Sequence, residues 1–199
     1  MITDDESLPD YLEQEQVAAL LKAAKAAKAA SIRDCALLLL VYKYGLRVHE
    51  ASAFNRNQVN FARRKIRIVR GKGSRSGEFS LFRDVHSSLT EYLRTRKDRS
   101  PALFVGRRGR LQKRRIEQLF ELHANTAGIP KKERRSIHSL KHSLAVHMLD
   151  AGKPLETIQD WLGHRSIGST QVYARISSRR RRAAVANELE NDPNIVSLA

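Results

Sequence analysis

Residues 138–147 read HSLKHSLAVH, and this stretch decides how the rest of the chain is interpreted. His138, Lys141 and His142 are spaced i, i+3 and i+4, so on a helix their side chains share one face. Three charged or chargeable groups on an otherwise apolar helix suit a phosphate-binding site better than a core. Two other interpretations stay open from this segment alone: a surface stripe, or His142 as a hydrogen-bonded core histidine. A zinc site has the right spacing but lacks an intervening Glu and a third ligand, so we expect no metal.

Two further stretches carry polar residues that follow the predicted end of a helix. Residues 161–175 read WLGHRSIGSTQVYAR, in which His164 follows a glycine and Tyr173 lies nine residues further on. Residues 44–50 read YGLRVHE, in which Arg47 also follows a glycine and Glu50 comes three residues later. Taken singly, a tyrosine is more often structural than catalytic, and Arg47 would be an ordinary salt-bridged arginine.

The composition narrows the class of protein. The 199 residues fit one ordinary domain, and a hydrophobic content of 41% is enough for a core, which excludes a basic disordered tail. No apolar run approaches the roughly 20 residues of a membrane span. The acidic start, MITDDE, fits neither a secretory signal nor a transit peptide. A single cysteine, Cys35, allows neither a disulfide framework nor a cysteine zinc site, which is typical of a reducing cytoplasm.

The net charge is +16, from 37 Lys and Arg against 21 Asp and Glu. Nucleic acid is therefore the first partner to consider, and an anionic membrane surface is the weaker alternative. The bases gather in blocks at 63–75, 107–115 and 131–135, at Arg175 and at 179–182. One block is typical of a solvated surface, but several blocks with few acids indicate binding to a phosphate backbone. We expect these residues to contact DNA: Arg63, Arg64, Arg70, Arg75, Arg107, Arg108, Lys113, Arg114, Arg115, Arg165 and Arg175.

The hydrophobic pattern predicts helices, then a small sheet, then helices. Helical spacing covers 12–29, 32–44, 85–97, 112–127, 138–151, 154–162 and 178–190. Short alternating runs near 59–61, 66–69 and 79–82 predict three strands, with a turn at 71–77. The fold class is therefore α+β and mainly α-helical, in a single domain with a small three-stranded antiparallel sheet.

The combination of motifs is more specific than its parts, because their order along the chain resembles the tyrosine recombinase (phage integrase) family. The matching stretches are YGLRVHE at 44–50, GKG at 71–73, HSLKHSLAVHML at 138–149 and LGHRSIGSTQVYARI at 162–176. The opening LPDYLEQEQVAALL at 8–21 resembles the start of the family's catalytic domain, so the resemblance covers about 8–177. It implies the DNA breaking-rejoining fold of that domain.

The resemblance also implies roles for six residues. Tyr173 would be the nucleophile that forms a 3′-phosphotyrosyl link to DNA and frees a 5′-hydroxyl. Cationic side chains would neutralise the transition-state charge, Lys72 would protonate the leaving oxygen, and His138 would assist proton transfer at Tyr173. The cationic side chains are those of Arg47, Lys141 and His164. Glu50 and His142 would orient these groups, and no cofactor is implied.

One residue departs from the family pattern, because the family usually has Arg where this chain has Lys141. Lysine carries a compact point charge, whereas arginine offers a planar fork to two oxygens. The site could therefore be slower, differently tuned or inactive. We expect Lys141 still to contact the scissile phosphate.

The resemblance extends to organisation and partners. Residues 1–177 would be the catalytic domain, with 1–7 as a flexible acidic lead. Residues 178–199 would be a basic helix and tail, either exchanged between protomers or lying on DNA or in solvent. Most members carry a further N-terminal domain, so the chain would be a fragment or resemble small members such as fimbrial invertases. The expected partners are double-stranded DNA, further copies in a tetramer on paired sites, and accessory DNA-bending proteins. The expected location is the cytoplasm, for a bacterial, archaeal, phage or plasmid-encoded protein, with no membrane contact.

Three functions fit these observations. The first is a site-specific DNA recombinase of the integrase or invertase type. The second is a non-catalytic DNA-binding regulator or architectural protein that keeps the fold, for which Lys141 is the sequence argument. The third is a type IB topoisomerase-like strand transferase, which shares the chemistry but relaxes DNA without pairing two sites.

Overall fold

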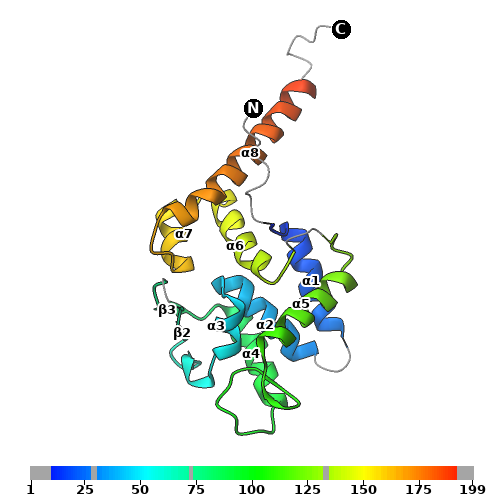
Figure 1. The fold of residues 1–199 in the computed structure, drawn as a ribbon, viewed down its shortest axis with the longest axis vertical. Coiled ribbons are helices and arrows are strands. Elements are labelled where there is room, and N and C mark those ends of the chain that lie inside the picture. The colour runs from blue at the N-terminus through cyan, green and yellow to red at the C-terminus, as the bar shows by residue number, and fades with distance from the viewer. Residues whose placement is uncertain (1–9, 28–30, 72–73, 132–134, 192–199) are drawn as a thin grey trace.

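The computed structural model describes residues 10–27, 31–71, 74–131 and 135–191. These residues form a mainly helical fold with a three-stranded antiparallel sheet and a two-stranded hairpin (Figure 1). The predicted fold class is thereby confirmed. The helices are α1 (Gln14–Ala26), α2 (Ser31–Tyr44), α3 (Val48–Ala53), α4 (Arg83–Thr95), α5 (Lys113–Thr126), α6 (His138–Asp150), α7 (Leu155–Leu162) and α8 (Gly168–Asn191).

Helix α2 lies at the centre of the fold. Its consecutive apolar residues 37–41 are all buried, so every side of the helix is covered. Helices α1, α4 and α6 pack around it, and Cys35 is half-buried beside the core. Gly45 ends α2 with a positive φ of 55°, a conformation that glycine adopts without strain. The chain therefore leaves the core at a fixed point, two residues before Arg47.

The three-stranded sheet has one exposed, polar face and one face that packs on the core. Its strands are β1 (Val59–Asn60), β2 (Lys65–Ile68) and β3 (Gly77–Ser80), paired antiparallel in the order β1-β2-β3. In β2, Ile66 and Ile68 are fully buried, while Lys65 and Arg67 are exposed. This alternation is the period of two that the sequence predicted. The strands also direct the turn between β2 and β3 towards the end of α7, where Ser74 forms an isolated β-bridge with His164.

Three small elements are absent from the sequence prediction. They are the short helix α3, the 3-10 helix η1 (Arg56–Gln58) and the hairpin of β4 (Val105–Gly106) and β5 (Gly109–Arg110). Six helical residues or a pair of two-residue strands are too short to show a hydrophobic period. The hydrophobic pattern therefore could not predict these elements.

Helices α6, α7 and α8 form a second apolar cluster that contains Tyr173 and Ile176. The prediction left residues 168–177 irregular and began a basic helix at 178, whereas α8 is one 24-residue helix through both. Tyr173 and Ile176 are three residues apart and both buried, so the packing of this helical face overrides the weak local propensity. The end of α8 projects beyond the other helices (Figure 1). Within the described part of the chain, none of the helices is long and apolar enough to cross a membrane.

Candidate active site

Arg47 occupies the turn between α2 and α3, where Glu50 holds it. The backbone N–H of Arg47 donates to Glu50 Oε2 at 2.9 Å, and the Nη1 of its side chain lies 3.4 Å from Glu50 Oε1. The same Nη1 donates to Ser74 Oγ at 2.7 Å. The side chain of Arg47 keeps 30% exposure, so its guanidinium is fixed yet open to an incoming anion.

Glu50 is buried, with only 1% of its side chain exposed. Burial by itself would raise the pKa of Glu50, but hydrogen bonds from the Arg47 backbone and from Arg70 hold that pKa below its ordinary value. The carboxylate also accepts from the backbone N–H of Gly71 at 3.3 Å. The predicted orienting role of Glu50 thus corresponds to contacts with the start of α3 and with the β2–β3 turn.

Arg70 was predicted to contact DNA, but the structure places its side chain inside the protein. Its side chain is 0% exposed, and its guanidinium donates to Glu50 and to three backbone carbonyls inside the protein. It therefore has no surface to offer DNA. The sequence misled here because Arg70 follows several exposed bases, and its burial just after β2 depends on tertiary contacts that composition does not reveal.

The β2–β3 turn meets the end of α7. Arg75 N donates to Gly163 O at 2.9 Å, and Ser74 pairs with His164. A Cβ on Gly163 would lie 2.6 Å from the carbonyl oxygen of Arg75, so this close approach requires glycine. Lys72, the predicted proton donor, lies outside the described residues. Its described neighbours Gly71 and Ser74 both contact the site.

Lys141 projects from α6 into this region and is almost completely buried, with 5% exposure. Its Nζ donates to the carbonyl oxygen of Leu162 at 3.2 Å. Burial, followed by the charges of Arg70 and Arg47, lowers the pKa of Lys141 to about 7. A bound anion would favour the protonated form again, so this group can gain charge as a phosphate arrives.

His164 lies just after the end of α7. Its Nδ1 is 3.1 Å from the Thr170 hydroxyl, and its ring stacks on the ring of Tyr173 with centroids 6.4 Å apart. Burial, then the charges of Lys141 and Arg47, lower the pKa of His164 to about 4. The imidazole is therefore neutral near pH 7 and can donate one N–H without adding a charge.

Tyr173 lies on α8 with 2% exposure, and burial raises the pKa of its hydroxyl to about 12. The hydroxyl oxygen is 2.9 Å from Nδ1 of His142. Burial lowers the pKa of His142 to about 4, so its neutral ring can accept this proton in the Nε2–H tautomer. The hydrogen-bond partner of Tyr173 is thus His142, whereas the resemblance assigned proton transfer to His138.

His138, at the start of α6, is half-buried. Burial, then the charges of Lys141 and Arg47, lower its pKa. The i, i+4 spacing of His138 and His142 places both side chains on the same face of α6. This spacing was the sequence signal that could have identified His142 as the partner of Tyr173. Ser74 and Thr170, which hold Arg47 and His164, gave no such signal because single hydroxyl residues are common everywhere.

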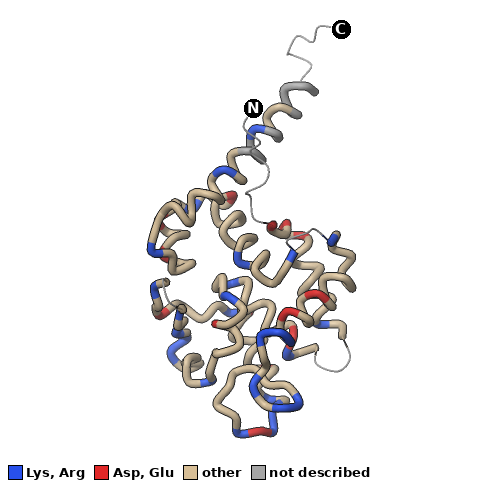
Figure 2. The backbone as a smooth tube through the Cα atoms, in the orientation of Figure 1, with Lys and Arg blue, Asp and Glu red and all other residues tan. Residues whose placement is uncertain are grey.

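The remaining predicted DNA contacts are exposed. This holds for Arg63, Arg64, Arg75, Arg107, Arg108, Lys113, Arg114, Arg115, Arg165 and Arg175. Lys and Arg are frequent along the backbone of the β2–β3 region and of the β4–β5 hairpin (Figure 2), although Glu78 of β3 lies 3.9 Å from Lys65. Exposure leaves each of these side chains able to reach a ligand.

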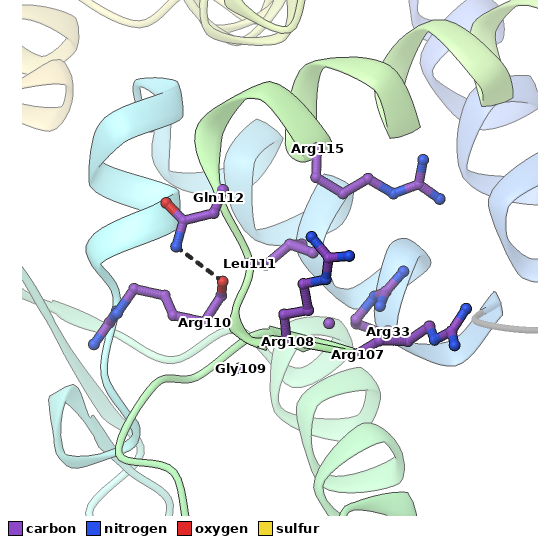
Figure 3. A pocket seen from close by; sticks show the side chains of 9 residues that line it. Arg33, Arg107, Arg108, Gly109, Arg110, Leu111, Gln112 and Arg115 are labelled. Carbon is purple, nitrogen blue, oxygen red and sulfur yellow. Dashed lines mark hydrogen bonds between the residues drawn. The ribbon is translucent and has the colours of Figure 1, made fainter.

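A pocket of about 660 Å³ lies where the β4–β5 hairpin meets the first turns of α2 and α5. We call it the arginine pocket, and its basic lining is Arg33, Arg107, Arg108, Arg110 and Arg115. Four of these side chains gather on one side, whereas Arg110 turns away towards Asn55, to which it donates at 2.7 Å (Figure 3). The described residues that line the pocket include no acid, although Arg33 pairs with its neighbour Asp34 at 2.7 Å. Such a concentration of guanidinium groups is suited to phosphate oxygens.

The site as a whole places the hydroxyl group of Tyr173 near cationic side chains and neutral histidines. These are the ingredients for attack on a phosphodiester, with fixed positive groups around the charge that develops. Among the residues that the structure describes, no group of three or more His, Cys, Asp or Glu side chains could hold a metal ion.

Comparisons with known proteins agree with this geometry. A sequence model of the phage integrase family matches residues 10–180. Tyrosine recombinase XerA of Pyrococcus furiosus is 34% identical over 191 residues, which cover 93% of this chain and 64% of that protein. This chain thus spans less than two thirds of that relative.

Solved structures give the same result. A crystal structure of XerA recombinase aligns with a TM-score of 0.75 and 27% identity, covering 90% of this chain and 64% of that one. XerH site-specific recombinase, solved in a post-cleavage complex with its difH substrate, aligns with a TM-score of 0.75 and 22% identity, covering 90% of this chain and 53% of that one, and shares the fold. Because the family's motifs, fold and sequence model extend over most of its length, the chain belongs to the phage integrase family.

Proposed function

We propose that this chain is the catalytic domain of a site-specific DNA recombinase of the integrase or invertase type, acting through a 3′-phosphotyrosyl intermediate. The observation that carries the proposal is the meeting of Arg47, Lys141, His164 and Tyr173, which come from four separate segments. Similarity to tyrosine recombinases over 93% of the chain supports it. The structure of XerH with DNA supports double-stranded DNA as the substrate class.

In the proposed reaction the hydroxyl oxygen of Tyr173 attacks a DNA phosphorus. The new O–P bond forms as the bond from phosphorus to the 5′-oxygen breaks. The tyrosine proton passes to His142, which it already contacts, or to His138, and Lys72 gives a proton to the 5′-oxygen. The phosphotyrosyl bond keeps the energy of the phosphodiester, so attack by another 5′-hydroxyl rejoins the strand without ATP.

The cations act on the charge of the transition state. A phosphodiester carries one negative charge, and the attacking phenolate adds a second. Arg47 and Lys141 supply two positive charges at fixed positions. His164, whose Nδ1 lies near the Thr170 hydroxyl, can donate from Nε2 to a phosphate oxygen.

The DNA-free form is a closed resting state in this proposal. Tyr173 is buried and its pKa of about 12 keeps the hydroxyl protonated, so the nucleophile is unreactive until DNA arrives. Entry of a phosphate between Arg47 and Lys141 would bring an anion to the cations and open α8 enough for in-line attack.

The exposed bases are assigned to the DNA backbone. The arginine pocket and the exposed arginines of the β2–β3 region provide sequence-independent contacts that weaken as salt rises. By analogy with the family, we also infer a tetramer on paired sites, accessory DNA-bending proteins, and a DNA-associated location in the cytoplasm. The division into a catalytic unit ending at 177 and a basic segment, either received by a neighbouring protomer or lying on DNA or in solvent, is part of the same proposal.

A DNA-binding regulator without chemistry is the second candidate, and the burial of Tyr173 together with Lys141 in the usual place of Arg favours it. A topoisomerase-like strand transferase is the third. Covalent attachment to DNA separates the recombinase from the regulator. Strand exchange on a two-site plasmid, measured beside simple relaxation, separates the recombinase from the topoisomerase.

The test begins with a pool of duplexes that carry a nick and a randomised centre. Cleavage beside the nick releases a short strand and traps the enzyme on DNA. Covalent complexes that survive SDS are sequenced, and the enriched duplex becomes the substrate. We expect wild-type protein to form the complex and Tyr173→Phe to form none while binding the duplex normally.

Tyr42→Phe is the matched control, because the Tyr42 hydroxyl also contacts a histidine, 2.8 Å from Nδ1 of His147. It should form the covalent complex at the wild-type rate. A wild-type protein that binds the duplex without forming the complex would support the regulator. A covalent complex that persists in Tyr173→Phe would overturn the assignment of the nucleophile.

A further inference from the structure

The guanidinium of Arg70 binds groups from three different segments of the chain. Its Nη1 donates to Gly45 O at 2.9 Å and to Glu50 Oε2 at 3.0 Å. Its Nη2 donates to Tyr44 O at 2.7 Å and to Trp161 O at 2.9 Å. The end of α2, the start of α3 and the end of α7 are thereby held together from within the protein.

Each of these segments carries a group of the proposed active site. The Tyr44–Gly45 carbonyls stand just before Arg47, and Glu50 contacts the backbone and side chain of Arg47. Trp161 precedes Leu162, whose carbonyl accepts from Lys141. Arg70 itself begins the turn that contains Lys72 and Ser74. One side chain therefore spans the segments that position the phosphate-binding cations.

The surroundings of Arg70 are shaped to its side chain. A Cβ on Gly163 would lie 3.2 Å from both Cγ and Nε of Arg70, closer than most carbon contacts, so the glycine leaves room for the arginine. Gly45 lies similarly close to Leu162, since a Cβ on Gly45 would lie 2.5 Å from Cδ2 of Leu162. Two glycines thus let the ends of α2 and α7 come close enough for one guanidinium to reach both.

The charges around Arg70 also balance in a way that suits the proposed reaction. Glu50 is the carboxylate that faces the three cations Arg47, Arg70 and Lys141. Glu50 pairs with Arg70 at 3.0 Å and with Arg47 at 3.4 Å, so its single negative charge leaves an excess of two positive charges for a ligand once Lys141 is protonated. Two uncompensated positive charges match the two negative charges of a phosphodiester attacked by a phenolate.

We propose that Arg70 is a positioning residue for DNA cleavage: its buried guanidinium fixes the segments that carry Arg47 and His164, together with the Leu162 carbonyl to which Lys141 donates, around one phosphate. The inference rests on the proposed recombinase function, although part of its test does not. Arg70 acts through these segments and has no exposed surface to touch DNA itself. Arginine is required because its planar fork reaches several acceptors at once, which a lysine ammonium cannot do in the same geometry.

Arg70 also has a measurable electrical effect on Lys141. After burial, the positive charge of Arg70 is the next largest influence lowering the pKa of Lys141 to about 7, followed by Arg47, with Glu50 acting in the opposite direction. Among the described residues, His138, His142 and His164 also interact electrostatically with this lysine. Removal of Arg70 should therefore raise the pKa of Lys141, because a like charge leaves and Glu50 is released towards it.

The experiment compares Arg70→Met, Arg70→Lys and a control, Arg96→Met, in the full chain. Arg96 is matched because 2% of its side chain is exposed and it binds Asp98 and the carbonyls of Ala102 and Leu103, away from the site. We measure covalent-complex formation at saturating nicked duplex, duplex affinity, the melting temperature, and the pKa of Lys141 by NMR of labelled lysine in DNA-free protein.

Arg70→Met should slow covalent-complex formation by about 100-fold, the effect expected when reacting groups shift by about 1 Å, while duplex affinity stays at the wild-type value. The Lys141 pKa should rise in this variant. Arg70→Lys keeps the charge but loses the fork, so the pKa should stay near that of wild type while the rate still falls by about 10-fold. Arg96→Met should lower the melting temperature without changing either readout.

Several results would overturn the inference. A wild-type rate in Arg70→Lys would show that the fork is unnecessary, and this holds even if Arg70→Met fails to fold. Equal losses in Arg70→Met and Arg96→Met would mean general destabilisation. If wild-type protein forms no covalent complex, the recombinase proposal fails, yet an unchanged Lys141 pKa in Arg70→Met would separately reject the role of Arg70.

Discussion

The candidate active site and the arginine pocket both concentrate positive charge, but in opposite environments. Lys141 and Arg70 are buried and held by protein carbonyls, and the pKa of Lys141 is lowered to about 7. Arg107 and Arg108 lie exposed on the β4–β5 hairpin, and the described residues that line their pocket include no acid. Under the proposed function these environments serve two purposes: Lys141 would stabilise the charge of a transition state from a fixed, desolvated position, whereas hydrated cations on the surface would hold the DNA backbone.

This contrast predicts that variants in the two regions change different quantities. Changes in the active site should alter the rate of cleavage on bound DNA. Changes in the arginine pocket should alter affinity and its dependence on salt. A variant that changes the cleavage rate and the affinity to the same extent would contradict the separate roles of the two regions.

Lys141→Ala should give the largest effect. Removal of one preorganised group that binds transition-state charge costs about 100- to 1000-fold in rate. Covalent-complex formation on the nicked duplex should therefore fall close to background, with duplex binding mostly intact. Lys141→Arg should keep the activity or raise it, because it supplies the fork that the family usually has.

Lys43→Ala is the control for this variant. Lys43 lies on α2 and pairs with Asp84 at 3.0 Å, on a partly exposed surface. It should change neither rate nor affinity measurably. A wild-type yield of covalent complex in Lys141→Ala would contradict the proposed contact between Lys141 and the scissile phosphate.

The double variant Arg107→Ala with Arg108→Ala should give an intermediate effect on binding. Loss of two phosphate contacts should reduce the slope of log affinity against log salt by about 2. Affinity should fall alike for different duplex sequences, because backbone contacts carry no base readout. Fluorescence anisotropy over a range of salt concentrations gives both quantities.

A matched control removes two exposed charges from α1, in Lys22→Ala with Lys25→Ala. This control should reduce the slope of log affinity against log salt concentration by less than the pocket variant does. The rate at saturating duplex should stay at the wild-type value in both. If the pocket variant and the control have the same slope, the arginine pocket does not contact DNA.

The pH dependence of stability should give the smallest effect. His142 and His164 have folded-state pKa values of about 4, below the ordinary value of 6.5. Between these values the unfolded chain binds more protons than the folded one, so stability rises with pH from 4 to 6.5 and is lost on acidification. The loss should be on the order of 1 kcal/mol for each histidine by linkage.

Urea unfolding at pH 7 and near pH 4.5 measures this effect. His164→Asn should reduce the difference between the two conditions, since one group that resists protonation is gone. An identical difference in wild-type protein and His164→Asn would mean that His164 is not buried in the neutral form.

The sequence predicted the helices and the three strands well because their hydrophobic periods are long enough to read. It also brought together Arg47, His164 and Tyr173 as motif positions. It could not predict that Arg70 is buried, since this depends on β2–β3 pairing and on the close approach at Gly163. The partnership of His142 with Tyr173 likewise depends on how α6 packs on α8.

The continuity of α8 shows a second reason why local patterns fall short. Gly168, Ser169 and Thr170 suggest a break, yet they form the first turn of a 24-residue helix. Contacts of Tyr173 and Ile176 with α6 and α7 stabilise this turn after folding. Tyr173, the proposed nucleophile, therefore lies on a packed helix, in a stretch for which the sequence pattern predicted no helix.

Identification of the residue that becomes attached to DNA is the direct test of Tyr173 as the nucleophile. Covalent complex formed on the nicked duplex is digested with nuclease and protease, and the remaining peptide is analysed by mass spectrometry. We predict a nucleotide joined through a 3′-phosphate to the peptide that contains Tyr173, and none in Tyr173→Phe. Attachment at another residue, or no attachment while the duplex is bound, would contradict the account.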